Sequence, residues 1–259
     1  MTTLTLLAKV RKERQIKQIQ NILNGFFEGL DAKYEVLGTT ETAWVQVAVS
    51  GEDEVVASKY IAKNIGLGPV SIEKARKFAD HKGFIESQEC NKEEILVDIG
   101  VFQPKIFYGK ISLRSLQVQL VGGAEVEMAK IVELFALRRN VPVGFKILSI
   151  NEQDNVIEGE LSVSQLKKFR VWRDSLLDRL IIVGASLAEV RRALKQADLY
   201  KDVIDVETLG VLEHSLTCKL GTDAVGLIPG IGKILRSATL TIFSPRNIAS
   251  FLETERIAN

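Results

Sequence analysis

Residues that commonly build metal centres and disulfide frameworks are scarce in this sequence. Its 259 residues include two cysteines and two histidines. Cys90 and Cys218 lie far apart, and neither belongs to a closely spaced cysteine pair of the metal-binding kind. The pattern argues against a zinc ribbon and against a disulfide scaffold. We expect the protein to hold no metal and no other cofactor.

Long apolar runs are missing as well. No run reaches the roughly 18 apolar residues that a membrane-spanning helix needs. The first residues, MTTLTLLAKVRKER, place their charges after the apolar run, which is the wrong order for a secretory signal. We therefore expect no membrane contact and, by elimination, a cytoplasmic location.

An excess of charge of either sign is also absent. The 34 lysines and arginines nearly balance 33 aspartates and glutamates, which leaves a formal net charge of +1. No overall positive field draws the protein onto nucleic acid, so a nucleic-acid site would have to be a local patch. With 46% hydrophobic residues, the chain has the composition of a folded globular protein throughout.

The N-terminal part of the sequence follows the order strand, helix, strand, strand, helix, strand. Alternating apolar residues indicate strands, and apolar residues at three- and four-residue steps indicate helices. This order is typical of a ferredoxin-like βαββαβ unit. The expected elements are a strand at 4–10, a helix at 16–30, strands at 34–37 and 45–49, a helix at 52–65 and a short strand at 69–73.

The C-terminal part repeats that order with little similarity of sequence. Ser186, with Glu189 three residues on, forms a capping box that predicts the start of a helix. A second ferredoxin-like unit is expected here, followed by a terminal helix. Its elements are strands at 180–183, 202–208, 211–220 and 239–243, with helices at 186–199 and 223–235, the latter broken near Pro229, and the terminal helix at 244–259.

The middle of the chain contains five short β-type runs separated by polar or glycine-bearing turns. The runs are KGFIES, ILVDIG, GKISLRSL, VPVGFKILSI and VIEGELS, with a helical segment at 126–135 before the fourth. Five strands are what an OB-type barrel needs. The sequence therefore predicts an α+β protein in which a central five-stranded OB-type barrel (77–164) is flanked by ferredoxin-like βαββαβ units at 1–76 and 165–259.

These runs resemble, in order, the strand signatures of the S-one RNA-binding domain. The matching segments are Lys82-Gly83-Phe84-Ile85, Val97-Asp98-Ile99-Gly100, Gly109-Lys110-Ile111 with Leu116, Val143-Gly144-Phe145-Lys146-Ile147 and Glu158-Gly159-Glu160-Leu161-Ser162. The resemblance implies an OB barrel that binds RNA.

As a whole, the chain resembles an uncharacterised archaeal family classed as a domain of unknown function. The resemblance lies in the segments LVGGAE, DVIDVETLGVLEHSL, CKLGTDAVGLIPGIGK and FSP. It implies an archaeal source and supplies no catalytic residues.

The sequence departs from the S-one pattern where that family usually stacks bases. Asn91 to Glu94 stand in place of the usual aromatic pair, and Ser112 replaces the usual histidine. Other aromatic residues interleaved with cations could replace them if they are exposed. The alternative is that Phe84 and Phe107 fill the barrel interior and the lysines are merely solvated. The candidate RNA-binding residues are Lys82, Phe84, Lys105, Phe107, Tyr108, Lys110 and Arg114, with Phe102 and Lys92 beside them.

The segment GLIPGIGK offers a second candidate site. It lacks the spacing and the Ser or Thr of a nucleotide P-loop. As a hairpin loop before a helix, it could instead hold a phosphate through Gly230, Gly232 and Lys233. The alternative is a helix that kinks tightly over the sheet at Pro229.

Three further groups carry weaker signals. The basic cluster around Lys167, Lys168 and Arg170 is more typical of a solvated connecting helix than of a phosphate site. His214 alternates with apolar residues and fits a core histidine. Asp202, Asp205 and Glu207 could hold a divalent metal, although an ordinary strand edge explains them as well.

The function that these patterns favour is non-catalytic RNA binding in archaeal translation, RNA processing or transcription. The expected partners are single-stranded or structured RNA, together with ribosomal or RNA polymerase proteins. One alternative is a protein-interaction module of the same machinery whose barrel has lost RNA binding. The weakest alternative is a metal-dependent enzyme that uses the acidic residues.

Overall fold

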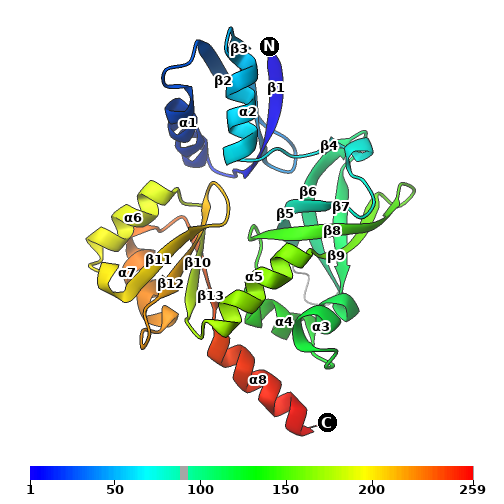
Figure 1. Cartoon of the computed structure of the whole chain (residues 1–259), viewed down its shortest axis with the longest axis vertical. Coiled ribbons are helices and arrows are strands. Elements are labelled where there is room, and N and C mark those ends of the chain that lie inside the picture. Colours follow the sequence, from blue (N-terminus) through cyan, green and yellow to red (C-terminus); the bar gives the residue numbers. More distant parts are fainter. Residues whose placement is uncertain (88–92, 259) are drawn as a thin grey trace.

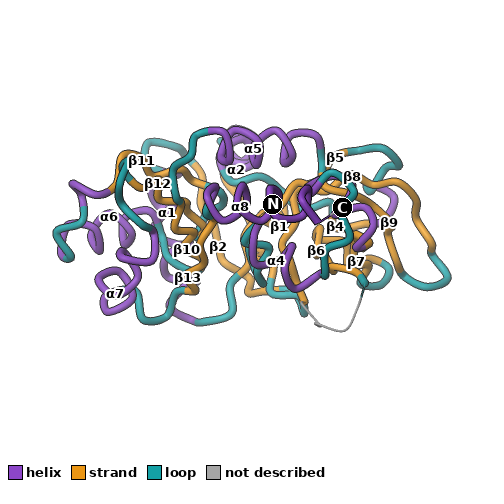
Figure 2. Tube along the Cα trace, turned by 90° about the horizontal axis from the view of Figure 1, so that it is seen from below, coloured by secondary structure: helices purple, strands orange, loops and turns teal. Residues whose placement is uncertain are grey.

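The computed structural model describes residues 1–87 and 93–258. Three α+β units meet around a common centre: the N-terminal unit at the top of Figure 1, the barrel at the right and the C-terminal unit at the left. Viewed from below, helices α6 and α7 lie at one end of the molecule and the barrel at the other (Figure 2). The predicted fold class, a central five-stranded barrel with flanking sheets and helices, is confirmed.

The N-terminal unit is a three-stranded antiparallel sheet covered by two helices. Its strands lie in the order β1-β3-β2. Ile19 and Leu23 of the amphipathic first helix are fully buried against Leu6 and Val47 of the sheet. The elements are β1 (Thr2–Lys9), α1 (Glu13–Phe27), β2 (Ala32–Thr39), β3 (Trp44–Gly51) and α2 (Glu54–Asn64).

The last short strand of this unit leaves its own sheet for the barrel. Leu67 forms a single antiparallel bridge to Leu6 of β1, and Gly68 N donates to the Thr5 carbonyl at 3.0 Å. Pro69 follows, and its missing N–H cannot extend the ladder. Strand β4 (Val70–Ser71) then pairs in parallel with the barrel strand β6. The residues predicted as the fourth strand of a βαββαβ unit therefore join the N-terminal unit to the barrel.

The barrel closes through the pairings β5–β6, β6–β7, β7–β9, β9–β8 and β8–β5. Only the β7–β9 pair among these is parallel. The ring of Phe145 fills the interior beside Gly109, where a Cβ would come within 2.7 Å of it. The elements are β5 (Asp80–Ser87), β6 (Glu94–Gln103), β7 (Phe107–Ser112), α3 (Leu113–Val121), α4 (Met128–Leu134), β8 (Pro142–Asn151) and β9 (Val156–Leu161).

Strand β7 is shorter than its apolar pattern predicts. The run 109–116 was expected to be one strand, but the Ser112 hydroxyl accepts a hydrogen bond from Ser115 N and caps helix α3. A serine at the N-cap satisfies an N–H that the first helical turn leaves unpaired. The second half of the run is therefore helical.

The C-terminal unit is a four-stranded antiparallel sheet in the order β11-β12-β10-β13. Helices α6 and α7 cover one face over a core that includes Leu180, Ile182 and Leu216. This is the order expected of a βαββαβ unit. The elements are α5 (Val163–Asp174), which leads into the unit, β10 (Arg179–Val183), α6 (Leu187–Gln196), β11 (Val203–Thr208), β12 (Glu213–Cys218), α7 (Ala224–Ile234), β13 (Thr239–Phe243) and α8 (Pro245–Ala258).

Shared apolar clusters join the three units. Phe169 of α5 stacks on Phe243 of β13 with ring centroids 5.9 Å apart, and both belong to the cluster that fills the barrel. Leu212, at the hairpin between β11 and β12, belongs to the cluster of the N-terminal unit. No helix of the described residues is long and apolar enough to cross a bilayer.

Candidate nucleic-acid interface

Strand β7 carries two of the predicted RNA-binding side chains on the outside of the barrel. Phe107 and Ile111 are 3% and 1% exposed and belong to the core, whereas Tyr108 and Lys110 alternate with them and are partly exposed. Successive side chains of a strand point to opposite faces, so Tyr108 and Lys110 face outward. The predicted stacking of Phe107 on RNA is wrong, because its ring fills the barrel interior.

The N-terminal unit covers the outward side of the neighbouring strands β5 and β6. The Trp44 ring meets the Phe84 ring edge-on, with centroids 5.5 Å apart. Trp44 Nε1 donates a 2.9 Å hydrogen bond to Oδ2 of Asp98, which pairs with Phe84 across the two strands. A Cβ at Gly100 would lie 2.9 Å from the indole, so glycine leaves the room that the ring needs.

Phe84 is therefore buried under another unit. It is 1% exposed, yet its neighbours Gly83 and Ile85 hold the inward positions of β5. The predicted stacking of Phe84 on RNA is wrong, and so is the alternative that it fills the barrel interior. Its ring instead forms part of the joint between the N-terminal unit and the barrel.

A network of ion pairs adjoins the contact between Trp44 and Phe84. Lys9 Nζ lies 2.8 Å from Asp98 and 2.6 Å from Glu86. Arg11 and Arg139 each approach the second oxygen of Glu86 at 2.7 Å. Burial alone would raise the pKa of Glu86, but hydrogen bonds from Lys9 and the two arginines lower it to about 2. The carboxylate is therefore ionised over the whole physiological range.

Tyr108 lies beside this network. Burial raises the pKa of its phenol, and the carboxylates of Asp98 and Glu86 raise it further. The guanidiniums of Arg11 and Arg139 act in the opposite direction. The side chains of both arginines are substantially exposed, at 40% and 56%. Two cations that solvent can reach thus lie within electrostatic reach of an aromatic ring.

Further cations lie on β7 and at its two ends. Lys110 lies 3.0 Å from Glu94, and both side chains are about one-third exposed. Lys105, in the β6–β7 turn, and Arg114, at the start of α3, are exposed and make no ion pair or side-chain hydrogen bond within residues 1–87 and 93–258. We refer to Tyr108, Lys110, Arg114, Lys105, Arg11 and Arg139 as the β7 strip.

The other members of the predicted RNA site are Lys82, Phe102 and Lys92. The ammonium of Lys82 donates to the Leu209 carbonyl of the C-terminal unit, so Lys82 is turned away from the β7 strip. Phe102 is only partly exposed, on β6. Lys92 lies outside the described residues, as do Cys90 and Asn91.

The predicted phosphate loop at Gly230, Gly232 and Lys233 is wrong. All three lie inside the continuous helix α7, which passes through Pro229. Their backbone N–H groups are therefore not at the start of a following helix, where a phosphate would bind. A Cβ at Gly230 would lie 3.0 Å from Leu199, so this glycine allows α7 to pack closely against the end of α6.

The acidic residues considered for a metal, Asp202, Asp205 and Glu207, lie on or just before β11. Within the described residues, no group of three or more His, Cys, Asp and Glu side chains is arranged to hold a metal ion. Glu207 accepts a hydrogen bond of 3.1 Å from Trp172 Nε1 and lies 2.9 Å from Lys168. Helix α5, which carries Lys168 and Trp172, therefore joins the barrel to the C-terminal sheet.

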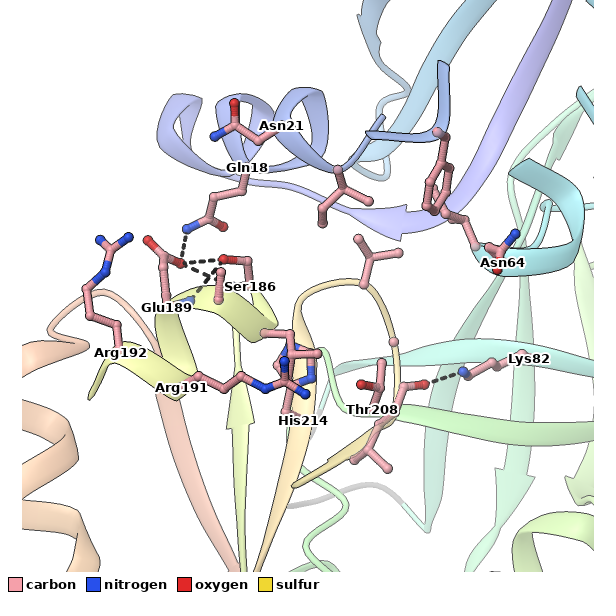
Figure 3. A pocket seen from close by; sticks show the side chains of 18 residues that line it. Gln18, Asn21, Asn64, Lys82, Ser186, Glu189, Arg191, Arg192, Thr208 and His214 are labelled. Atoms are coloured by element: carbon pink, nitrogen blue, oxygen red, sulfur yellow. Dashed lines mark hydrogen bonds between the residues drawn. The ribbon is translucent and has the colours of Figure 1, made fainter. Parts of the chain in front are cut away.

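The main feature that the sequence did not indicate is a pocket of about 710 Å³ between the three units. Its walls come from α1, the end of α2, Lys82 of β5, the start of α6 and the β11–β12 hairpin. In Figure 3, Gln18 approaches Glu189 from α1, and Arg191 extends across the same pocket. His214 is 1% exposed, and burial, assisted by the charge of Arg191, lowers its pKa to about 4. Residues so far apart in the chain share no local motif.

Comparisons with known proteins follow the division into units. Residues 3–67 match the DUF2110 N-terminal domain, and residues 177–243 match the DUF2110 C-terminal domain. Together the two segments cover just over half of the chain. A comparison with curated proteins gives no match.

Two solved structures show distant likeness. A chain of the a/eIF2alpha–aDim2p–rRNA complex from Pyrococcus horikoshii OT3 is 8% identical, with a TM-score of 0.25 over 48% of this chain and 60% of that one. The intact alpha subunit of aIF2 from Pyrococcus abyssi is 11% identical, with a TM-score of 0.23 over 65% of this chain and 97% of that one. At such low TM-scores, function has to be argued from the chain's own residues.

Proposed function

The chain belongs to the DUF2110 family, and from the geometry of its barrel we propose that it binds single-stranded RNA without catalysing a reaction on it. The observation that carries the proposal is the position of Tyr108, a partly exposed ring on the outward face of β7, with Arg11 and Arg139, which pair with Glu86, within electrostatic reach. Exposed rings stack on nucleotide bases, and neighbouring cations contact the phosphates.

The β7 strip has the spacing that a nucleotide chain needs. Tyr108 and Lys110 are two residues apart on one face, which separates them by roughly 7 Å. Arg114 follows the strand in the first turn of α3. Because Arg114 and Lys105 have no ion pair within the described part of the chain, phosphate contacts there would break no existing pair. We propose an RNA partner in translation, RNA processing or transcription.

Binding of a fluorescent single-stranded RNA oligomer to the full chain tests the proposal. Tyr108→Ala should remove about 1–3 kcal/mol of stacking, which is roughly a 5- to 100-fold rise in Kd. Tyr108→Phe keeps the ring and should bind nearly as well as the wild type. Phe78→Ala is the matched control, because Phe78 is 65% exposed and lies outside the strip. Absence of RNA binding even at low salt would overturn the proposal.

A second candidate function is a protein-interaction module, and the joint at Trp44 favours it. The outward face of β5 and β6 already packs against protein through the Trp44–Phe84 contact. A barrel that binds one protein unit on this surface could bind another along β7. The test is to purify the full chain with its bound proteins after nucleic acid has been removed. A protein partner that stays bound to the wild type, and binds Tyr108→Ala more weakly, would support this candidate over RNA binding.

A further inference from the structure

The pocket between the three units contains buried polar groups without partners. His214 is 1% exposed, and apart from a weak interaction with the Ala185 backbone neither of its ring nitrogens has a hydrogen-bond partner within the described residues. Gln18 is 8% exposed; its Nε2 donates to Glu189, whereas its Oε1 has no partner in the described part of the chain. Buried polar groups are nearly always hydrogen-bonded, so two incompletely bonded groups in one pocket wall have hydrogen-bonding capacity left for a bound molecule.

The pocket also contains cations that the protein does not neutralise. Arg191 and Arg192 make no ion pair or side-chain hydrogen bond among residues 1–87 and 93–258. Glu189, the acidic residue in the lining, already has partners within the protein, because its carboxylate accepts hydrogen bonds from Arg14, Gln18 and Ser186 N. Burial would raise the pKa of Glu189, but these hydrogen bonds lower it. The charge that the pocket offers to a ligand is therefore positive.

The neutral polar and apolar groups of the pocket suit a heteroaromatic ring. Burial lowers the pKa of His214 to about 4, so at neutral pH its imidazole is uncharged, and beside the nitrogen that interacts with the Ala185 backbone it has one ring nitrogen left for a ligand. The unpaired Gln18 Oε1 adds an acceptor, and Phe26 adds an aromatic wall. Arg191 lines the same pocket and lies within electrostatic reach of His214 (Figure 3). Donor, acceptor and guanidinium thus converge on one space.

We propose that this pocket binds a single nucleoside phosphate, with the phosphate on Arg191 and Arg192 and the base edge on Gln18 and His214. The volume of about 710 Å³ lies within the range of small-molecule sites, roughly 300–1,000 Å³. Guanidinium groups are the preferred partners of phosphate because they can donate two parallel hydrogen bonds. The site is separate from the β7 strip and does not depend on RNA binding there.

Calorimetric titration of the full chain with AMP, GMP, CMP and UMP tests the inference. At least one monophosphate should bind, and its nucleoside, which lacks the phosphate, should bind about tenfold more weakly or worse. Arg191→Ala and Gln18→Leu should each raise Kd by about tenfold. Lys195→Ala is the matched control, because Lys195 is an exposed cation of the same helix outside the pocket lining and should leave binding unchanged.

Two results would overturn the inference. One is that none of the four monophosphates binds to the folded full chain. The other is that a monophosphate binds equally well to the wild type, Arg191→Ala and Gln18→Leu. Thermal unfolding of each variant checks that it is folded, and Arg191 is exposed, so its replacement should leave the fold intact.

The nucleotide could be free or could be one unit of an RNA chain, and a second titration distinguishes these sources. If it belongs to RNA, Arg191→Ala should weaken oligomer binding as much as monophosphate binding. If it is free, oligomer binding should stay at the wild-type value. If the protein binds monophosphates but no RNA oligomer, this inference is supported and the proposed function is overturned. Failure of the inference can therefore be distinguished from failure of the proposed function.

Discussion

The indole Nε1 of Trp44 donates a 2.9 Å hydrogen bond to Oδ2 of Asp98, and the same oxygen lies 2.8 Å from Nζ of Lys9. Asp98 is 1% exposed, and its other oxygen accepts from Gly100 N. A buried carboxylate is costly unless it is paired and hydrogen-bonded. Docking of the N-terminal unit therefore pairs a buried charge on the barrel, and it removes the outward side of β5 and β6 from any open nucleic-acid surface.

Gly100→Ala should destabilise this joint. The residue has φ +83, and its Cβ would meet the Trp44 ring at 2.9 Å. Gly122→Ala is the matched control, because Gly122 has φ +70 and nothing lies within 4 Å of its Cβ. Positive φ alone should cost about 1–2 kcal/mol in each variant. We expect urea unfolding to show an additional loss of about 1–3 kcal/mol for Gly100→Ala from overpacking. Equal losses in the two variants would contradict the described packing of Trp44.

Glu86 should make the protein less stable in acid. Its pKa is lowered to about 2, because the hydrogen bonds from Lys9 and the arginines outweigh burial. A lowered acid pKa contributes stability that is present above the unfolded pKa and is lost as the pH falls toward the folded one. Between pH 4.5 and 2 we expect the free energy of unfolding to lose about 3 kcal/mol from this group. Urea titrations should show this loss in the wild type and in Glu133→Gln, but not in Glu86→Gln.

Glu213 should have the opposite effect on stability. Burial raises its pKa to about 7, although the N–H of Leu212 and the charge of Lys82 act against this. The folded state then holds the proton where the unfolded state has released it, so stability falls as the pH rises from about 4.5 to about 7. We expect the free energy of unfolding of Glu213→Gln, relative to that of the wild type, to rise by about 3 kcal/mol between pH 4.5 and pH 8. A stability difference that is the same at both pH values would contradict this assignment.

Most elements could be predicted because each has a local pattern. The spacing of Ile19 and Leu23 indicates a helical face, and Ser186 with Glu189 indicates a helix start; both are confirmed. The strand with which Val70–Ser71 pairs could not be predicted. Two residues are too few to show a periodic pattern, and their partner strand lies some 30 residues further along the chain. Helix α7 was predicted to break at Pro229, but it continues as part of a close contact with the end of α6.

The candidate sites were harder to predict than the fold. Phe84 and Phe107 have the same residue type and are both buried, but Trp44 covers one and the barrel encloses the other. Such burial depends on how units dock, which no local pattern encodes. The pocket is a stronger example, because Gln18, Lys82, Arg191 and His214 come from three units and converge only in the folded chain.

The salt dependence of RNA binding tests the central claim most directly. For single strands, the slope of log K against log salt is roughly −0.7 for each phosphate contact. If RNA lies along the β7 strip, Arg114→Ala should reduce the magnitude of the slope by roughly 0.7. Arg170→Ala, which removes an exposed cation of α5 instead, should leave the slope unchanged. Wild-type slopes in both variants, or no binding by the wild type at low salt, would contradict the account.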